Sequence, residues 1–94
     1  MRVKWLRTAL ANLEADADYV AQDSPEAASR VVNAIEEAVS KLAEFPAMGR
    51  AGRVTGTREL VVPGTPYIIP YRVRNGALEV LRVFHGARRW PREF

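Results

Sequence analysis

Two segments in the N-terminal half of the chain carry apolar side chains at the spacing of an amphipathic helix. The first stripe spans residues 6–21 and consists of Leu6, Ala9, Leu10, Leu13, Ala17 and Val20. The second ends near Phe45-Pro46 and consists of Ala28, Val31, Val32, Ile35, Ala38, Val39 and Leu42. Each stripe predicts a helix with one buried face. Between them, Ser24 can cap the second helix and Pro25 suits its first turn, which predicts a short connection and an antiparallel helical hairpin.

Strand patterns flank this hairpin on both sides. Residues 1–5 alternate polar and apolar, with Val3 and Trp5 on one face, as in a short strand. Further strands are predicted at residues 58–62, 67–74 and 78–84, where turn residues separate the runs. We therefore predict an α+β fold in a single domain, residues 1–94. An N-terminal strand, the two-helix hairpin and a three-stranded antiparallel meander form it, with both helices on one face of a small sheet.

The middle strand predicts which side chains face the helices. Tyr67, Ile69, Tyr71 and Val73 share one face and should pack on the helices, whereas Ile68, Pro70, Arg72 and Arg74 share the outer face. The last strand is apolar on both sides, although two helices can cover only one. The outer face is therefore predicted to be an uncovered, arginine-rimmed surface for a protein partner. The residues assigned to that partner are Ile68, Arg72, Leu81, Arg82 and Val83.

The Asn75-Gly76 turn constrains the register of the last two strands. A two-residue turn pairs Arg72 with Glu79 and places Pro70 opposite Leu81 at a hydrogen-bonded position. Proline has no N–H to donate there. We therefore predict either a longer turn or a bulge near Leu81.

Composition narrows the class of protein. The chain has 94 residues, of which 48% are hydrophobic, and it contains no cysteine and one histidine. Disulfides and thiolate metal sites are thereby excluded, a lone histidine argues against zinc, and we expect no cofactor. No apolar run approaches the roughly 18 residues of a membrane-spanning helix, and no signal-peptide pattern opens the chain. We expect a soluble, cytoplasmic protein with no membrane partner.

The charge is divided unevenly along the chain. Residues 1–45 hold five Lys or Arg and eight Asp or Glu, whereas residues 46–94 hold nine Arg and three Glu. Arginine binds carboxylates and phosphates through a planar fork, so the second half predicts an acidic or phosphate-bearing partner. The alternative is that the arginines of the second half serve only to keep the protein soluble. Arg82 lies among apolar neighbours and is expected to pair with Glu36, Glu37 or a carboxylate of the partner.

The C-terminal end combines basic and aromatic residues. His85, Arg88, Arg89 and Trp90 form the candidate target-binding cluster, because arginine and tryptophan are enriched in binding hot spots. Each residue also has a structural alternative. His85 can be a hydrogen-bonded residue at a strand end, and the arginines can be solvated charges. Trp90, followed by Pro91, indicates a docked tail.

Several stretches, taken in order, resemble the RelE/ParE superfamily of bacterial type II toxins over nearly the whole chain. They are Pro46-Ala47-Met48-Gly49-Arg50, Gly56-Thr57-Arg58-Glu59-Leu60-Val61-Val62, Tyr71-Arg72-Val73, and Glu79-Val80-Leu81-Arg82-Val83-Phe84-His85-Gly86-Ala87-Arg88-Arg89-Trp90-Pro91. The resemblance implies a cognate antitoxin that wraps an extended, partly helical segment around the protein. An acidic or amphipathic segment of a ParD-like antitoxin would then be the partner of the outer face.

The resemblance leaves two mechanisms open. RelE-like members cleave mRNA on the ribosome, and ParE-like members act on DNA gyrase without catalysis of their own. RelE-like toxins place an arginine where Ile68 stands here and commonly carry a tail tyrosine that this chain lacks. The similarity therefore favours a ParE-like gyrase inhibitor. A ribonuclease, the alternative, would have to use His85, Glu59, Arg72 and Arg82, and a non-toxic interaction domain is the third possibility.

Overall fold

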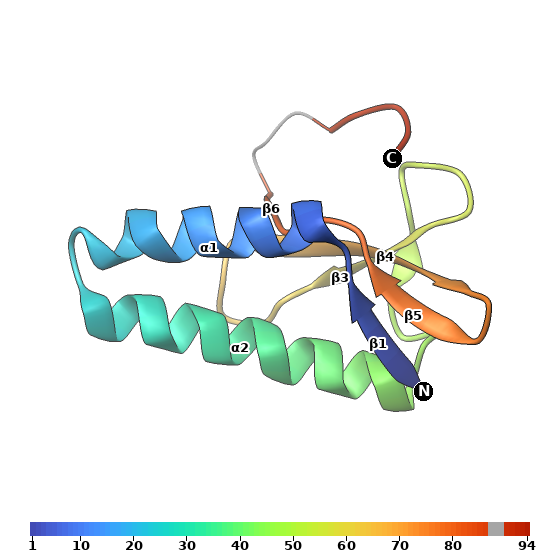
Figure 1. The fold of residues 1–94 in the computed structure, drawn as a ribbon, viewed down its shortest axis with the longest axis horizontal. Helices are drawn as coiled ribbons and strands as arrows, with labels where there is room; N and C mark the ends of the chain where they lie inside the picture. Colours follow the sequence, from blue (N-terminus) through green and yellow to red (C-terminus); the bar gives the residue numbers. More distant parts are fainter. Residues whose placement is uncertain (87–89) are drawn as a thin grey trace.

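Two helices and a mixed sheet form the two layers of the protein (Figure 1). The computed structural model describes residues 1–86 and 90–94. The elements are β1 (Arg2–Trp5), α1 (Arg7–Ala21), α2 (Pro25–Glu44), β2 (Arg50–Ala51), β3 (Arg58–Val61), β4 (Tyr67–Arg74), β5 (Ala77–Val80) and β6 (Phe84–His85). The predicted strand, helical hairpin and following strands are thus confirmed. Among the described residues, neither helix is long and apolar enough to cross a membrane.

The helical hairpin forms where the sequence signals it. The Ser24 side chain accepts a hydrogen bond from the Ala27 N–H at 3.1 Å, and Pro25 occupies the first turn of α2. Glu26 adds a negative charge to that turn, which the helix dipole favours. Helix α1 starts at Arg7 without a side-chain cap, so its stability comes from packing rather than from its terminus.

The sheet has the strand order β1-β5-β4-β3-β2, with β6 also paired to β4. Strand β1 runs parallel to β5, whereas the pairs that join β2 to β5 are antiparallel. The predicted antiparallel meander is therefore correct for the later strands, and the complete sheet is mixed. A parallel pair requires a connection that returns the chain to the end of the sheet where the first strand began, and the long segment between β1 and β5 provides it.

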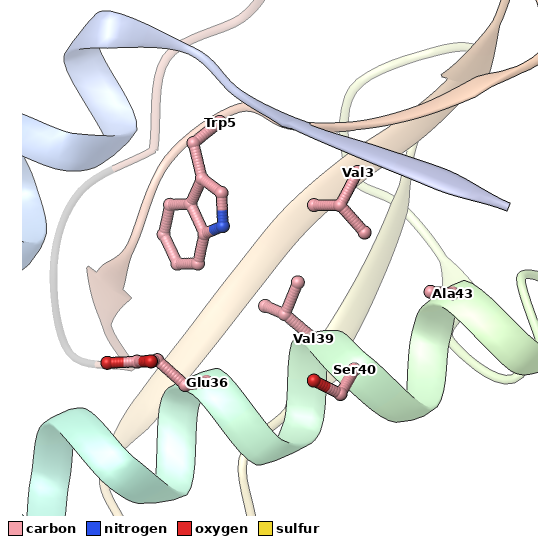
Figure 2. A pocket seen from close by; sticks show the side chains of 6 residues that line it. All are labelled: Val3, Trp5, Glu36, Val39, Ser40 and Ala43. Carbon is pink, nitrogen blue, oxygen red and sulfur yellow. The ribbon is translucent and has the colours of Figure 1, made fainter.

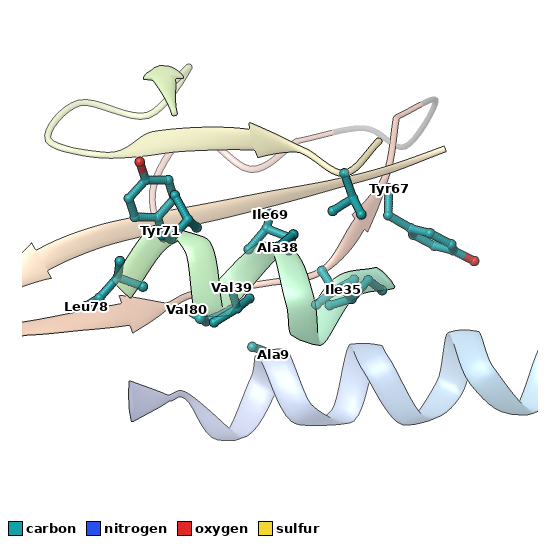
Figure 3. Close-up of a cluster of buried hydrophobic side chains, with 12 residues drawn as sticks. Ala9, Ile35, Ala38, Val39, Tyr67, Ile69, Tyr71, Leu78 and Val80 are labelled. Atoms are coloured by element: carbon teal, nitrogen blue, oxygen red, sulfur yellow. The ribbon is translucent and has the colours of Figure 1, made fainter. Parts of the chain in front are cut away.

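Both helices cover one face of the sheet. The buried core between the layers contains Ile35, Val39 and Leu42 of α2, together with Ile69 and Tyr71 of β4 (Figure 3). Tyr67 is also buried there, as predicted, but Val73 is 49% exposed. The prediction for Val73 is wrong because the tip of the β4–β5 hairpin extends past the helices (Figure 1).

The hairpin register agrees with the sequence prediction. Asn75 and Gly76 have φ values of 52° and 73°, as in a two-residue turn, and Arg72 pairs with Glu79. The ladder is then interrupted at Pro70, as expected. The Leu81 N–H donates to the Pro70 carbonyl at 3.0 Å, but Pro70 has no N–H with which to return the bond.

A bulge follows at this point. Residues 69–70 of β4 stand opposite the three residues 81–83 before pairing resumes between Ile68 and Phe84. The Leu81 carbonyl accepts instead from Arg82 Nη1 at 2.6 Å. Of the two predicted alternatives, the bulge near Leu81 is confirmed and the longer turn is not found. The single strand predicted for residues 78–84 is wrong because the bulge divides it into β5 and β6.

The expectation of an uncovered apolar outer face is wrong. Ile68 is 7% exposed, and Leu81 and Val83 are fully buried. Val83 belongs to the helix-side core, where its N–H donates to the Asn12 side chain of α1 at 3.2 Å. The extra residue in the bulge reverses the side-chain alternation, so Val83 faces the helices rather than the outer side.

Candidate functional site

The outer face of the sheet, which points away from the helices, carries most of the candidate functional residues. The cross-strand pairs Glu59–Pro70, Ile68–Phe84 and Arg72–Glu79 place their side chains on it. The loop that follows β2 and the C-terminal segment, residues 90–94, add to this face from the chain itself. Figure 1 shows the C-terminus next to that loop.

A buried carboxylate organises one part of this face. The Glu59 side chain is 1% exposed, and its Oε1 atom accepts from Arg50 Nη2 at 3.1 Å. The other oxygen accepts from the backbone N–H of Arg53 at 2.7 Å, and Arg53 Nε lies 3.6 Å from Oε1. A buried carboxylate is tolerated only when it is paired and hydrogen-bonded, as here. Glu59 therefore fixes the loop that carries Arg53.

The segment Pro46–Arg50 is fixed by a tyrosine of the sheet. The Tyr71 hydroxyl donates to the Pro46 carbonyl at 2.6 Å and accepts from the Gly49 N–H at 2.9 Å. A side chain at Gly49 would lie 2.6 Å from this hydroxyl, so glycine is required for space. Burial raises the pKa of the Tyr71 phenol, although the Gly49 N–H and the charge of Arg58 oppose that shift. The phenol therefore stays protonated as a structural donor.

Three aromatic rings cluster beside the loop that carries Arg53. The Trp90 ring lies edge-to-face on Phe84 with centroids 5.0 Å apart, and Phe94 lies 6.3 Å from Phe84. The Arg53 guanidinium stands 4.3 Å from the Trp90 ring centroid, and Arg82 stands 5.2 Å from that of Phe94. The buried Trp90 Nε1 has no hydrogen-bond partner among the described residues. Two cation–π contacts and ring packing thus hold the C-terminal segment on the outer face.

The Arg72–Glu79 pair occupies the opposite end of the outer face. Arg72 Nε donates to Glu79 Oε1 at 2.7 Å, and both side chains are largely shielded from water. The hydrogen bond from Arg72 holds the pKa of the Glu79 carboxyl below its ordinary value, which burial alone would raise. Arg72 is therefore already paired within the chain, although the sequence assigned it to a partner.

The four candidate ribonuclease residues are spread along the sheet. His85 pairs with Tyr67 at one end of β4, and their rings lie edge-to-face with centroids 5.9 Å apart. Arg72 lies five residues further along β4, a strand distance of about 16 Å. Glu59 is buried under Arg50 and Arg53, and Arg82 donates to the backbone of the bulge. The structure does not bring these groups around one point.

The structure places the candidate binding residues in different surroundings. His85 is exposed and Trp90 is half-buried, while Arg88 and Arg89 lie outside the described residues. Of the set assigned to the partner, Ile68, Leu81 and Val83 are buried, and Arg72 and Arg82 make internal contacts. Arg82 contacts Phe94 and the Leu81 carbonyl rather than Glu36 or Glu37.

Sequence reasoning missed Arg53 and Phe94. Nothing local in the sequence links Arg53 to a tryptophan 37 residues later. A weak signal was present in the three aromatic residues that fall close together at positions 84, 90 and 94. Such spacing in a tail indicates aromatic packing, but not the partner against which it packs.

Two grooves flank α2 away from the outer face. The first, of about 280 Å³, lies between β1 and α2, where Val3 and Trp5 point toward the helix and Glu36 stands at one end (Figure 2). The second, of about 270 Å³, lies between α2 and β3 and includes the exposed side chains of Met48 and Val61. Both grooves are shallow and largely apolar, which suits contact with a protein segment more than with a small polar ligand.

Comparison with known proteins identifies relatives over nearly the whole chain. A family model described as ParE toxin of type II toxin-antitoxin system, parDE, matches residues 3–90. The putative toxin Y4kP of Sinorhizobium fredii is 48% identical over 90 residues, which cover 96% of this chain and 93% of that protein. Toxin RelE2 of Caulobacter vibrioides is 41% identical over 87 residues, which cover 93% and 97%.

A solved structure also matches. A chain of the chromosomal ParDE TA system from P. aeruginosa superposes with a TM-score of 0.81 at 35% sequence identity. The match covers 90% of this chain and 95% of that chain. The fold and the sequence therefore agree on the same group of proteins.

Proposed function

Because the chain belongs to the ParE toxin family of type II toxin–antitoxin systems, we propose that it inhibits DNA gyrase by binding to it. A cognate antitoxin then neutralises the protein by binding to it in turn. The proposed target contact is the C-terminal end of the chain, with His85, Arg88, Arg89 and Trp90 as assigned from the sequence. The toxin itself carries out no chemical step in this proposal.

The dispersal of the ionisable groups is the observation that carries the proposal. Cleavage of a phosphodiester requires a proton acceptor, a proton donor and a cation around one phosphate. Glu59 and Arg72 are held in internal ion pairs at separate places on the sheet, and Arg82 is bonded to the bulge. A protein-binding inhibitor needs a surface rather than such a convergence, and the basic, aromatic C-terminal end provides one.

The comparisons favour a ParE-like function, and they also include a relative with a RelE name. The matching family model and the solved structure carry the ParE and ParDE names, but one relative is named RelE2. A ribosome-dependent ribonuclease therefore remains the second candidate. In that case His85, the one histidine, would be the residue on which activity depends most.

The antitoxin is proposed to carry an acidic, amphipathic segment. The second half of the chain has an excess of arginine, which favours an acidic partner. Since Ile68 and Leu81 are buried, an antitoxin on the outer face would contact them only after displacing the chain's own cover, and Val83, which faces the helices, is out of its reach. An acidic residue that reached Arg72 would have to compete with Glu79.

Two assays with purified protein separate the candidates. We expect the wild-type protein to inhibit gyrase supercoiling and to leave ribosome-bound mRNA intact. His85→Ala should retain most of the inhibition, whereas Trp90→Ala or removal of residues 88–94 should abolish most of it. Circular dichroism and binding to the antitoxin encoded beside the toxin serve as controls for folding.

The opposite pattern would refute the proposal. If the wild-type protein cuts mRNA on ribosomes and has no effect on supercoiling, and if His85→Ala alone removes that activity, the chain is a ribonuclease. Absence of both activities from a protein that is toxic in cells would point to a different target.

A further inference from the structure

We infer that Arg53, held by the buried carboxylate of Glu59, is a positioning residue that fixes the C-terminal segment, residues 90–94, in its target-binding orientation. This inference rests on the proposed function, because it assigns the target contact to that end of the chain. It adds that a loop far upstream in the sequence controls how the segment is presented. Three contacts carry it in turn.

The first contact fixes Arg53 itself. Glu59 lies in β3, paired with Arg50 of β2 on one side and Pro70 of β4 on the other, so its position is set by the sheet. Its carboxylate accepts from the Arg53 N–H at 2.7 Å and lies 3.6 Å from Arg53 Nε. The backbone bond is charge-assisted and made to a side chain that is 1% exposed, so it is strong and directional, whereas the Arg53 side chain, 48% exposed, adds an ion pair. Arg53 is thereby held at both its backbone and its guanidinium.

The loop around Arg53 has little freedom of its own. The Gly52 N–H donates to the Thr57 carbonyl at 2.8 Å, and the Thr57 hydroxyl donates to the Val54 carbonyl at 2.6 Å. Gly52 packs so closely on Thr57 that an added Cβ would clash with it. The residues on both sides of Arg53 are thus tied together, and the guanidinium is presented from a closed loop.

The second contact links the fixed Arg53 side chain to the C-terminal segment. The Arg53 guanidinium lies 4.3 Å from the Trp90 ring centroid, within the usual range of a cation–π contact. Phe84 contacts the same indole edge-to-face at 5.0 Å. The indole is therefore held between a fixed cation and a strand residue, and it is more an anchor than a freely exposed binding side chain.

The third contact holds the other end of the segment. Phe94 packs against Phe84, with ring centroids 6.3 Å apart, and Arg82 lies 5.2 Å from the Phe94 centroid. Pro91, Arg92 and Glu93 lie between the two aromatic anchors and are exposed. A segment that is held at both ends presents its middle residues in one conformation. Such preorganisation lowers the ordering cost of binding.

Arg50 provides a matched control for Arg53. Both arginines pair with Glu59, at 3.1 Å and 3.6 Å, but only Arg53 lies over Trp90. Arg53→Ala and Arg50→Ala therefore both remove a positive charge from Glu59, and only the first removes the contact to the tail. Arg53→Lys keeps a cation that can reach the indole and should restore part of the effect.

The first experiment follows Trp90 directly and needs no target. In a Trp5→Phe background, Trp90 is the only remaining tryptophan of the chain, so its fluorescence reports the segment alone. Acrylamide quenching should rise about twofold or more in Arg53→Ala, remain near the parent value in Arg50→Ala and lie between them in Arg53→Lys, because the cation–π contact is the element removed. Equal quenching in Arg53→Ala and Arg50→Ala would overturn the inference.

The second experiment measures inhibition of gyrase supercoiling by the same proteins. Arg53→Ala should be weaker by roughly three- to tenfold, as expected for a preorganised contact, while Arg50→Ala should stay near wild type. Equal potency of Arg53→Ala and the parent, or higher potency after release of the tail, would refute positioning. If even the parent does not inhibit gyrase, the proposed function fails, and the quenching result still decides whether Arg53 holds the segment.

Discussion

The two faces of the sheet are covered in different ways. Toward the helices, the sheet buries aliphatic and aromatic side chains against α1 and α2, and Ile35, Leu42 and Ile69 have no exposed surface. On the outer face, the cover consists of the loop with Arg53 and the C-terminal segment. The contacts there are an ion pair between the buried Glu59 and the half-exposed Arg53, two cation–π contacts and aromatic edges.

The two faces therefore contribute differently: the helix side stabilises the whole fold, and the outer side sets the conformation of the C-terminal segment. The helix side depends on buried area, which is large and shared by many residues, so single losses there reduce the stability of the whole fold. The outer side depends on a few directional contacts around Trp90, so losses there should alter one segment while the remaining fold persists. The following predictions test this contrast, beginning with the largest expected effect.

Leu42→Ala should destabilise the protein most. Leu42 is fully buried between α2 and the sheet, and such truncations leave a cavity that costs about 2–5 kcal/mol. Denaturant unfolding measures the change. Leu10→Ala makes the same substitution at a residue that is 44% exposed and should cost less than about 1 kcal/mol. Equal losses at the two sites would contradict the assigned core.

Gly49→Ala should come next. The added methyl would lie 2.6 Å from the Tyr71 hydroxyl and 2.9 Å from the Glu59 carbonyl, so backbone must shift. We expect a loss of about 1–3 kcal/mol in the free energy of unfolding. Ala47→Ser, at an exposed neighbouring position, is the control. An unchanged unfolding midpoint for Gly49→Ala would mean that the loop does not pack on Tyr71 as described.

Trp90 should distinguish the outer face from the core. Trp90→Ala removes a half-buried ring and should cost about 1–2 kcal/mol, less than Leu42→Ala, yet abolish most target inhibition. Trp90→Phe keeps the ring packing and removes a buried N–H that has no partner among the described residues, so stability should change by less than about 1 kcal/mol. Thermal unfolding and supercoiling assays on the same samples test both statements. Loss of fold in Trp90→Ala would show that the two faces are not separable.

The smallest effect is expected at the Arg72–Glu79 pair. Because the pKa of Glu79 is lowered in the fold, its contribution is complete above the unfolded-state pKa, near 4.3, and is lost as the pH falls through the folded value. Glu79→Gln should therefore cost about 1 kcal/mol near neutrality and almost nothing once the carboxyl is protonated. Unfolding curves recorded from pH 7 downward through the acid range measure this. A cost that is independent of pH would mean that the charge of Glu79 is not involved.

Local sequence patterns determined most of the fold. The apolar stripes defined α1 and α2, and Ser24 with Pro25 marked the break between them. The Asn75-Gly76 turn set the register, and the missing N–H of Pro70 predicted either a longer turn or a bulge near Leu81, of which the structure has the bulge. Each of these features depends on neighbours within a few residues, where backbone geometry and hydrogen-bonding capacity can be read directly.

Only the tertiary structure decided how the outer face is covered. The bulge turned Val83 toward the helices, and the C-terminal segment returned to pack on Phe84. Arg53 and Trp90 are far apart in the sequence, and no periodicity relates them. Their contact exists because Glu59, fixed by the sheet, aims Arg53 at the place where the tail returns. Periodicity specifies which side of an element is apolar, but the partner that covers that side follows from packing in three dimensions.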